Sequence, residues 1–159
     1  MFVDERTKEA YEKSLRGELF QKARAIILKD GKVAYIKNLE TGLVTIPGGG
    51  VDEGETVQEA VVREAFEETG MKVEPILEVA RKYYDVPMQM GETKFVSKRV
   101  EYVYLCKYLG RENGFAGLEG EYEGATNIYF GEIDDLTNCY QTQETAEKVK
   151  NFCKTHKSF

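Results

Sequence analysis

The sequence predicts an α/β (α+β) fold with a mixed β-sheet. A central segment has helical periodicity, with start and stop signals at its two ends. Aliphatic-rich segments bounded by turn residues lie before and after it. Strands on both sides of a central helix are typical of α/β or α+β proteins, in which helices cover a sheet.

The first part of the chain is predicted to hold a helix followed by a β-hairpin. Residues 4–19 are helix-capable because apolar side chains recur there at helical spacing, namely Tyr11, Leu15 and Leu19. Residues 23–28 (ARAIIL) are a candidate for a buried strand. Asp30-Gly31 is a hairpin turn signal, so residues 32–36 form the return strand.

The central helix is predicted over residues 56–70 (TVQEAVVREAFEETG). Thr56 followed by Glu59 fits a capping box, and Gly70 fits a C-terminal stop. Its apolar side is expected to consist of Ala60, Val61, Ala65 and Phe66. The remaining expected elements are strands over residues 43–46, 73–86, 94–109 and 128–133, the middle two joined around Met90-Gly91, and a helix over residues 143–156.

Length and composition exclude several classes of function. The 159 residues suffice for one core, so residues 1–159 are expected to form a single domain. A net charge of −6 argues against a basic nucleic-acid-binding surface, so no nucleic-acid partner is expected. Three scattered Cys and one His leave little material for a disulfide framework, a His-based zinc site or a Ser-His-Asp triad. With no membrane helix and no secretory signal apparent, the sequence predicts a cytoplasmic protein.

Three carboxylates of the central helix form the candidate chemical site. Glu64, Glu67 and Glu68 occupy positions i, i+3 and i+4, so they share one face. Like charges at this spacing destabilise a bare helix by a few tenths of a kcal/mol per pair, which a bound cation would offset. Clustered carboxylate oxygens suit hard divalent ions, Mg²⁺ first and Mn²⁺ second. Arg63 stands beside Glu64 and i to i+4 with Glu67, so its guanidinium can orient a carboxylate.

For any one of these glutamates, a solvated acidic helix is the alternative interpretation. A solvated helix does not explain the whole ordered set, which includes glycines at fixed positions as well: Gly49, Glu55, Arg63, Glu64, Glu67, Glu68 and Gly70. At this composition, a chance match at seven fixed positions is expected on the order of 10⁻⁵ times over the chain. The glycines before the helix expose backbone groups without Cβ obstruction, so the segment can approach a phosphate or a metal.

The segment from Gly49 to Met71 resembles the Nudix box, G-x5-E-x7-R-E-U-x-E-E-x-G-U, where U is apolar. All the fixed positions are filled, and Ala65 and Met71 occupy the two apolar ones. An ARAIILKDGKVAYI hairpin before it and a YFGEIDDL segment after it extend the resemblance along most of the chain. The chain is thus similar to Nudix hydrolases, and a Nudix fold with a mixed sheet between helices is expected.

The resemblance implies Mg²⁺-dependent hydrolysis of a phosphoanhydride in a nucleoside diphosphate linked to another group. The metal ligands it implies are Glu64, Glu67, Glu68 and the Gly48 carbonyl, and Gly48 and Gly49 would also approach the substrate. Arg63 would hold the glutamates, while Glu55 and Gly70 would support the loop and the helix end. The base that activates water would be a glutamate of the box or one in the loop over residues 119–123, with Glu121 favoured. Homodimers are common among proteins of this kind.

The substrate is less defined than the reaction. A nucleoside triphosphate, including oxidised forms, is favoured by the small size of the chain, and ADP-ribose or a nucleotide sugar is the alternative. Pro87, soon after the box, resembles a family feature of ADP-ribose and dinucleoside polyphosphate hydrolases, but a turn at a strand edge explains it equally well. The family's usual Trp before the box is Val44 here, and Gly50 stands where a larger side chain is common. The residues of the nucleobase pocket are therefore not defined by the resemblance.

Two rival functions use the same fold. A nucleotide-sensing module without catalysis usually has eroded box glutamates, whereas all are intact here. A diphosphate isomerase would need a reactive Cys, and no Cys lies near the box. Tyr102, Tyr104 and Tyr108 alternate along one strand face, which is more typical of a packed sheet than of a base-stacking platform, and Cys106 is expected in the core.

Overall fold

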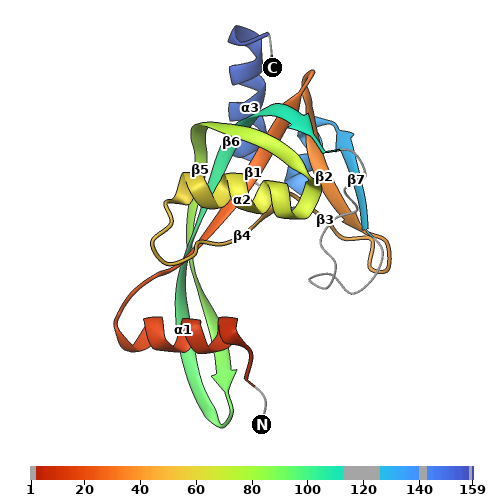
Figure 1. Ribbon diagram of the computed structural model, residues 1–159. Coiled ribbons are helices and arrows are strands. Elements are labelled where there is room, and N and C mark those ends of the chain that lie inside the picture. The colour runs from red at the N-terminus through yellow and green to blue at the C-terminus, as the bar shows by residue number, and fades with distance from the viewer. Residues whose placement is uncertain (1–2, 113–125, 140–142, 158) are drawn as a thin grey trace.

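The computed structural model describes residues 3–112, 126–139, 143–157 and 159 of the chain. Within these ranges, a seven-stranded mixed sheet is combined with helices (Figure 1). The elements are α1 (Glu5–Leu15), β1 (Phe20–Lys29), β2 (Lys32–Asn38), β3 (Val44–Thr45), β4 (Gly48–Gly50), α2 (Val57–Thr69), β5 (Met71–Met90), β6 (Thr93–Arg111), β7 (Thr126–Gly131), a 3₁₀ helix (Ile133–Asn138) and α3 (Gln143–Thr155). The predicted fold class is confirmed.

The sheet has the order β3-β2-β1-β6-β5, with β4 paired to β1 and β7 paired to β2. β1 and β6 run parallel from Phe20 beside Arg99 to Leu28 beside Lys107, and the other pairs are antiparallel. The hairpin predicted at Asp30-Gly31 is present, since Lys29 pairs with Lys32 across it. The sheet is therefore mixed, as the sequence predicts.

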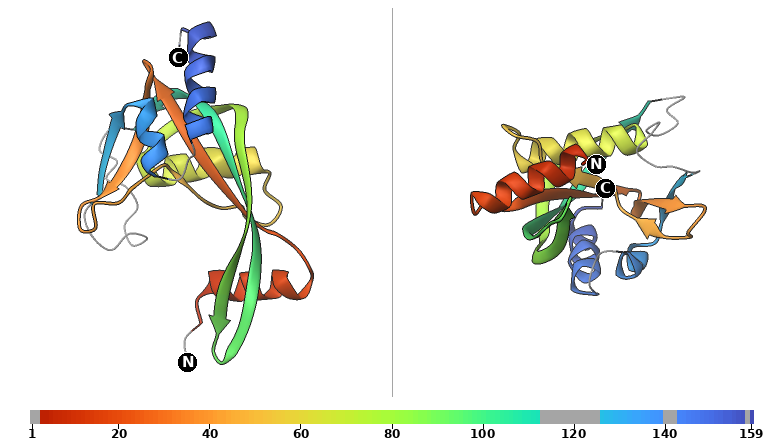
Figure 2. Two further views of the ribbon diagram at one scale, coloured as in Figure 1. Left: turned by 180° about the vertical axis from the view of Figure 1, so that it is seen from behind. Right: turned by 90° about the horizontal axis from the view of Figure 1, so that it is seen from below.

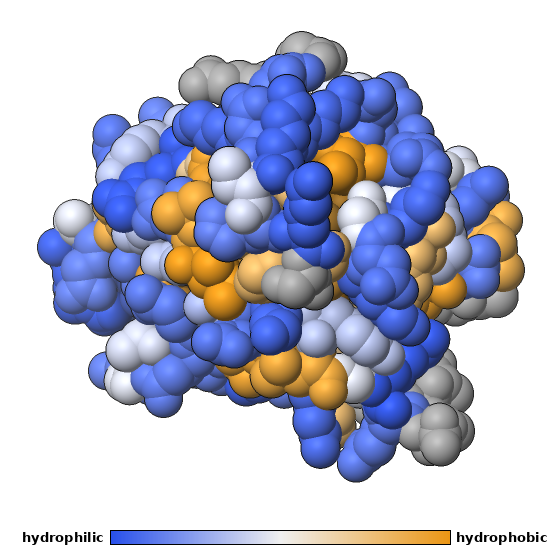
Figure 3. Space-filling model, turned by 90° about the horizontal axis from the view of Figure 1, so that it is seen from above, coloured by the Kyte–Doolittle hydropathy of each residue, from blue (hydrophilic) through white to orange (hydrophobic). Residues whose placement is uncertain are grey.

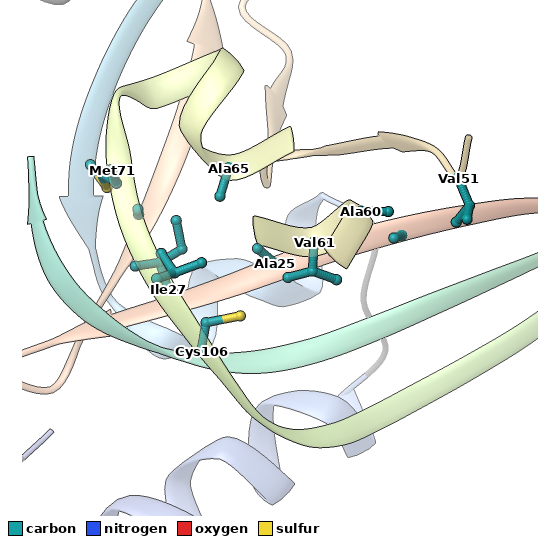
Figure 4. Packing of buried hydrophobic residues seen from close by; sticks show 11 residues of the cluster. Ala25, Ile27, Val51, Ala60, Val61, Ala65, Met71 and Cys106 are labelled. Atoms are coloured by element: carbon teal, nitrogen blue, oxygen red, sulfur yellow. The ribbon is translucent and has the colours of Figure 1, made fainter. Parts of the chain in front are cut away.

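Helices α2 and α3 cover opposite faces of the sheet, as the two views from front and back show (Figures 1 and 2). Under α2 the core contains Ala25, Ile27, Val61, Ala65 and Met71, seen together in Figure 4. Under α3 and the 3₁₀ helix lies a second cluster, whose buried members include Ile26, Leu28, Val33, Tyr35, Leu105, Leu136 and Val149. Alternate residues of β1 thus feed the two cores, which is the period-2 pattern of a strand covered on both faces.

A long hairpin made of β5 and β6 projects away from the α2–sheet–α3 sandwich (Figures 1 and 2). We call its distal part, residues 83–100, the hairpin arm. Helix α1 packs against this arm, where the Tyr11 and Phe95 rings meet edge to face at 5.2 Å between centroids. An isolated two-stranded hairpin is marginally stable in water, so α1 supplies a packing surface that the arm otherwise lacks.

The structure corrects three expected boundaries. The first helix ends at Leu15 instead of residue 19, because Gly17 takes a positive φ of 69° and reverses the chain, and Leu15 and Leu19 stay exposed. The strand expected over residues 43–46 is shorter, and a separate strand, β4, follows Pro47 and pairs with β1. The last strand ends at Gly131, so Ile133 begins the 3₁₀ helix.

The exposed apolar side chains are scattered over different elements, among them Leu15 on α1, Leu43 before β3 and Leu109 on β6. On the face drawn in Figure 3, hydrophobic patches are divided by hydrophilic side chains. Within the described ranges, none of the helices combines the length and the apolar character needed to cross a membrane. The apolar surface therefore does not by itself indicate a function.

Candidate active site

Helix α2 positions the acidic residues beside the glycine strand β4. Its N-terminus has the predicted capping box, in which Thr56 and Glu59 each accept a hydrogen bond from the other's backbone N–H. Its C-terminus is closed by Gly70, whose φ of 74° is the left-handed conformation that glycine adopts freely. Because Ala60, Val61 and Ala65 are buried against the sheet, the neighbouring stripe of the helix carries Glu64 and Glu68 to β4. The remaining expected member of its apolar side, Phe66, is only half-buried.

The guanidinium of Arg63 is the hub of the site. It donates to Glu55 through Nε (2.8 Å) and Nη2 (3.0 Å), and to Glu64 (2.9 Å) and Glu67 (3.1 Å) through Nη1. Nη2 also donates to the Gly50 carbonyl at 2.9 Å, which ties the helix to β4. A planar guanidinium presents five N–H groups in a fixed fork, so it can hold several carboxylates in one orientation.

The loop before α2 is held by Glu55. Its Oε1 accepts a hydrogen bond from the Asp52 backbone N–H at 3.0 Å, and both its oxygens accept from Arg63. The hydrogen bonds from Arg63 lower the pKa of Glu55, with the Asp52 N–H adding to the effect, so Glu55 is a carboxylate at neutral pH. The same hydrogen bonds, which Arg63 donates to Glu55, raise the pKa of Arg63, and the contact with Glu64 adds to the effect. Glu55 thus connects the Asp52 backbone to the Arg63 guanidinium.

β4 lies against two of the carboxylates. The Gly48 backbone N–H donates to Glu68 Oε2 at 3.0 Å. At Gly49, an added Cβ would lie 2.6–2.7 Å from the carboxyl atoms of Glu64, which is closer than real Cβ atoms come. Only glycine allows this approach, because any side chain would displace the Glu64 carboxylate. Glu64 and Glu68 are both buried, so this part of the site is enclosed by protein.

The site carries an excess of negative charge. Arg63 contacts four carboxylates, those of Glu55, Glu64 and Glu67 and, at 3.4 Å, that of Asp52. Buried carboxylates need cationic compensation, and one guanidinium supplies a single positive charge. Among the described residues, no three acidic, His or Cys side chains are placed so that they could hold a metal ion by themselves. Arg63 draws Glu64 and Glu67 to itself, while the Gly48 N–H holds Glu68.

Most of the predicted site residues come together in the structure. Glu64, Glu67, Glu68, Arg63, Glu55, Gly48 and Gly49 form one connected cluster, and Gly70 lies at the end of its helix. The predicted alternative base Glu121, with Glu119 and Glu123, lies outside the described residues. Two members of the cluster are absent from the sequence-based prediction: the Gly50 carbonyl and Asp52. Asp52 carries a signal in the sequence, since it stands in the acidic loop before the helix.

The aromatic residues and Pro87 lie elsewhere. Tyr104 and Tyr108 pack against the core under α2, as the packed-face interpretation predicts, whereas the Tyr102 ring lies under the Arg81 guanidinium. Cys106 is fully buried. Burial raises the pKa of the Cys106 thiol, so it is not a reactive thiolate. Pro87 stands in the hairpin arm, opposite Val96.

Comparison with known proteins identifies the family. The model of the NUDIX domain matches residues 19–149 of the chain. An ADP-ribose pyrophosphatase of Methanocaldococcus jannaschii is 52% identical over 59 residues, which cover 34% of this chain and 35% of that protein. An RNA pyrophosphohydrolase of Brucella anthropi is 49% identical over 49 residues, covering 30% of this chain and 28% of that protein. The matches therefore span about a third of these curated relatives.

A solved structure extends the likeness over most of the chain. The crystal structure of an ADP-ribose pyrophosphatase from Streptococcus suis covers 87% of this chain and 92% of its own, with a TM-score of 0.57 and 25% sequence identity. The family match itself includes the whole carboxylate cluster, from β4 through α2. By its sequence, by its fold and by this cluster, the chain belongs to the NUDIX domain family.

Proposed function

We propose that the chain is a Mg²⁺-dependent Nudix hydrolase that cleaves a phosphoanhydride bond in a nucleotide, with nucleoside triphosphates as the preferred substrate class. The observation that carries the proposal is the Arg63-centred cluster of carboxylates beside β4. Hydrolysis of a phosphoanhydride requires neutralisation of the charge on phosphate oxygens, and a protein with net charge −6 needs a cation to bind such a group at an acidic site.

The donor set suits a magnesium or manganese ion. Glu64, Glu67 and Glu68 offer carboxylate oxygens from one helix face, which hard divalent cations prefer. The Gly48 N–H points away from β1 towards Glu68, and the N–H and C=O of one residue in an antiparallel ladder point to the same side. The Gly48 carbonyl is therefore expected on the same edge. The ligands proposed are these three carboxylates and this carbonyl.

A bound divalent ion would supply charge neutralisation at the phosphates and a lower pKa for a coordinated water. The protein's own part is orientation and proton acceptance. Arg63 and Glu55 keep the carboxylates in place, and the bare backbone of β4 lets the diphosphate approach. In the reaction, the water oxygen bonds to one phosphorus while the anhydride P–O bond breaks and its electron pair leaves with the other phosphate. The proton of the water passes to a carboxylate, either one of this cluster or Glu121.

ADP-ribose is the second candidate substrate. It is favoured by the likeness to the Methanocaldococcus jannaschii and Streptococcus suis proteins, both named ADP-ribose pyrophosphatases. A sensing module without catalysis is disfavoured, since the full set of box glutamates is retained and connected. A thiol-dependent isomerase is disfavoured because Cys106 is buried away from the carboxylates in the core. The cytoplasm is the compartment we propose, on the sparse and odd number of cysteines.

The test is a Mg²⁺-dependent hydrolysis panel of nucleoside triphosphates, oxidised guanine nucleotides, ADP-ribose and nucleotide sugars, with products identified by mass. We expect turnover of one class with release of a nucleoside monophosphate, and a loss of about 10³-fold or more in Glu68→Gln at unchanged thermal stability. Glu74→Gln, which removes an exposed carboxylate from β5, is the matched control. A folded, metal-loaded protein that hydrolyses no member of the panel would refute the proposal.

A further inference from the structure

The two faces of the hairpin arm have different surroundings. On one face, Phe95 meets the Tyr11 ring of α1, and Met88, which pairs with Phe95, borders the first turn of the same helix. Because side chains alternate along a strand, the pairs next to Met88–Phe95 point the opposite way. We call that opposite side the outer face. Its exposed residues are Tyr83, Asp85, Pro87 and Gln89 of β5 and Lys94, Val96 and Lys98 of β6.

The outer face presents apolar groups to solvent. The Tyr83 and Val96 side chains are 61% and 49% exposed, and Pro87, which pairs with Val96, is exposed as well. A two-stranded hairpin needs a packed layer to be stable in water, and α1 supplies that layer on the other face. Covering the outer face would therefore remove apolar area from water and stabilise the arm.

The outer face carries both a projecting ring and a hollow. A cavity of about 520 Å³ lies near the tip of the arm, lined by three successive pairs from Pro87–Val96 to Gln89–Lys94. The middle pair faces α1, so the two outer-face pairs form the walls of the cavity. Tyr83 stands four residues before Pro87 in the same strand, which places it about 13 Å from the cavity along the arm.

The charge of the outer face favours contact between two copies of the chain. Copies of a protein with net charge −6 repel each other. On the outer face, Lys94 and Lys98 against Asp85 leave a charge of +1, so the repulsion is weakest where two outer faces meet. Asp85 and Lys98 are paired across the two strands, so their charges cancel in the middle of the face.

We propose that the outer face of the hairpin arm binds the outer face of a second copy of this chain in a two-fold symmetric dimer. In such a contact the same patch occurs on both sides, so a ring and a hollow on one face can fill each other. When the arms are antiparallel and the axis passes midway between Tyr83 and Pro87, the Tyr83 ring of each copy lies over the cavity of the other. Because the arm projects from the sandwich, this arrangement keeps the two sandwiches at opposite ends (Figure 2).

The size of the outer face sets the strength of the contact. Its eight residue pairs, from Tyr83–Val100 to Met90–Thr93, make a surface roughly 25 Å long and 10 Å wide. Such an area belongs to the small class of interfaces, those that bury less than about 1,200 Å² in total. Burial of two tyrosine rings contributes a large part of the contact. We therefore expect a reversible dimer with a dissociation constant on the order of 10 μM.

The first experiment measures self-association by sedimentation equilibrium at protein concentrations from about 1 to 300 μM, a range that brackets the expected dissociation constant. Tyr83→Ala and Val96→Glu should each weaken the dimer about 10-fold or more, the first by removing the buried ring and the second by placing a charge in the contact. Both side chains are exposed in the single chain, so the thermal unfolding of dilute protein should not change. Leu109→Glu is the matched control, because Leu109 is an exposed aliphatic residue of β6 outside the arm, and it should leave the affinity within about twofold.

The second experiment locates the contact. The photoreactive residue p-benzoylphenylalanine replaces Tyr83, and equal amounts of unlabelled and ¹⁵N-labelled protein are mixed, so that crosslinks between copies are recognised by mass. We expect crosslinks from position 83 to residues 87–96 of the other copy. A protein that stays monomeric up to about 300 μM, a dimer that Tyr83→Ala and Val96→Glu weaken no more than Leu109→Glu does, or crosslinks confined to residues outside the arm would each overturn the inference. Both experiments are independent of metal and turnover, so their outcome does not depend on the proposed function.

Discussion

Gly49→Ala is the substitution that tests the geometry of the site most directly. The new methyl carbon would lie 2.6 Å from the Cδ and Oε1 atoms of Glu64 and 2.7 Å from Oε2. Ordinary contact begins at 3.4 Å, so the carboxylate must retreat by about 0.8 Å or β4 must move by the same amount. The atom displaced is the end of a side chain, so the fold can absorb the change. The position of Glu64 cannot be kept.

The expected result is a large loss of turnover with a modest loss of stability. A displacement near 1 Å at a reacting centre costs about 10²-fold in rate, while overpacking costs about 1–3 kcal/mol of the free energy of unfolding. The rate is measured in Mg²⁺ on the substrate found by the panel, and the stability by urea unfolding followed by circular dichroism.

Two other glycines serve as controls. Gly42→Ala puts a methyl group into open space at a φ of 75°, so it costs about 1–2 kcal/mol through backbone strain without touching the carboxylates. Gly48→Ala would place Cβ next to the Ala23 carbonyl oxygen and the Arg24 backbone, which cannot yield, so it should chiefly impair folding. If Gly49→Ala keeps kcat within about threefold of Gly42→Ala, the fixed position of Glu64 is not needed for catalysis, and the reasoning fails.

Three further substitutions test the supporting interactions. Thr56→Ala removes the capping side chain of α2 and should lower the free energy of unfolding, measured by urea titration, by about 1 kcal/mol. An unchanged free energy would mean that the cap is dispensable. Glu55→Gln should destabilise at pH 7, because the pKa of Glu55 is lowered in the folded state. Its stabilising contribution is fully present above the unfolded value of about 4.5 and is lost as the pH falls through the lower folded value, so the difference from the wild type should shrink in acid; a difference independent of pH in urea titrations contradicts this. Arg24→Met leaves the Glu101 carboxylate buried without its guanidinium partner, so it should lower the free energy of unfolding by about 3–5 kcal/mol. The double variant with Glu101→Leu should recover most of this loss, and an equally unstable double variant would contradict the role of the pair.

Local signals predicted α2 and the carboxylate cluster almost completely. The capping box, Gly70 and the spacing of Glu64, Glu67 and Glu68 all act within a single helix, where residue spacing fixes which side chains share a face. The contacts of Arg63 with Glu55 and Glu67 also span only a few residues of the same segment. Such features depend little on the rest of the fold, so one sequence suffices to predict them.

The cluster of cations near the start of α1 could not be predicted in the same way. Arg6, Lys22 and Arg99 lie on three separate elements, and only the parallel pairing of β1 with β6 and the docking of α1 on the hairpin arm bring them together. The apolar spacing of Tyr11, Leu15 and Leu19 led to an overlong helix, because spacing alone does not reveal that the helix packs on a narrow hairpin. One signal was available: the charged Lys22 and Arg24 stand in β1 just before its apolar run over residues 25–28.

The length of β5 makes the free side of the sheet a hazard for self-association. In the strand order β5 ends the sheet on the side of β6. It is 20 residues long and, among the described strands, pairs only with β6, so a row of its backbone groups is available to another chain. Two of the three prolines of the sequence, Pro75 and Pro87, stand in this strand, where each removes an N–H donor. Three register shifts between Lys72 and Ala80 further distort its ladder with β6. The interruptions of β5 thus make it a poor template for the strand of a second molecule.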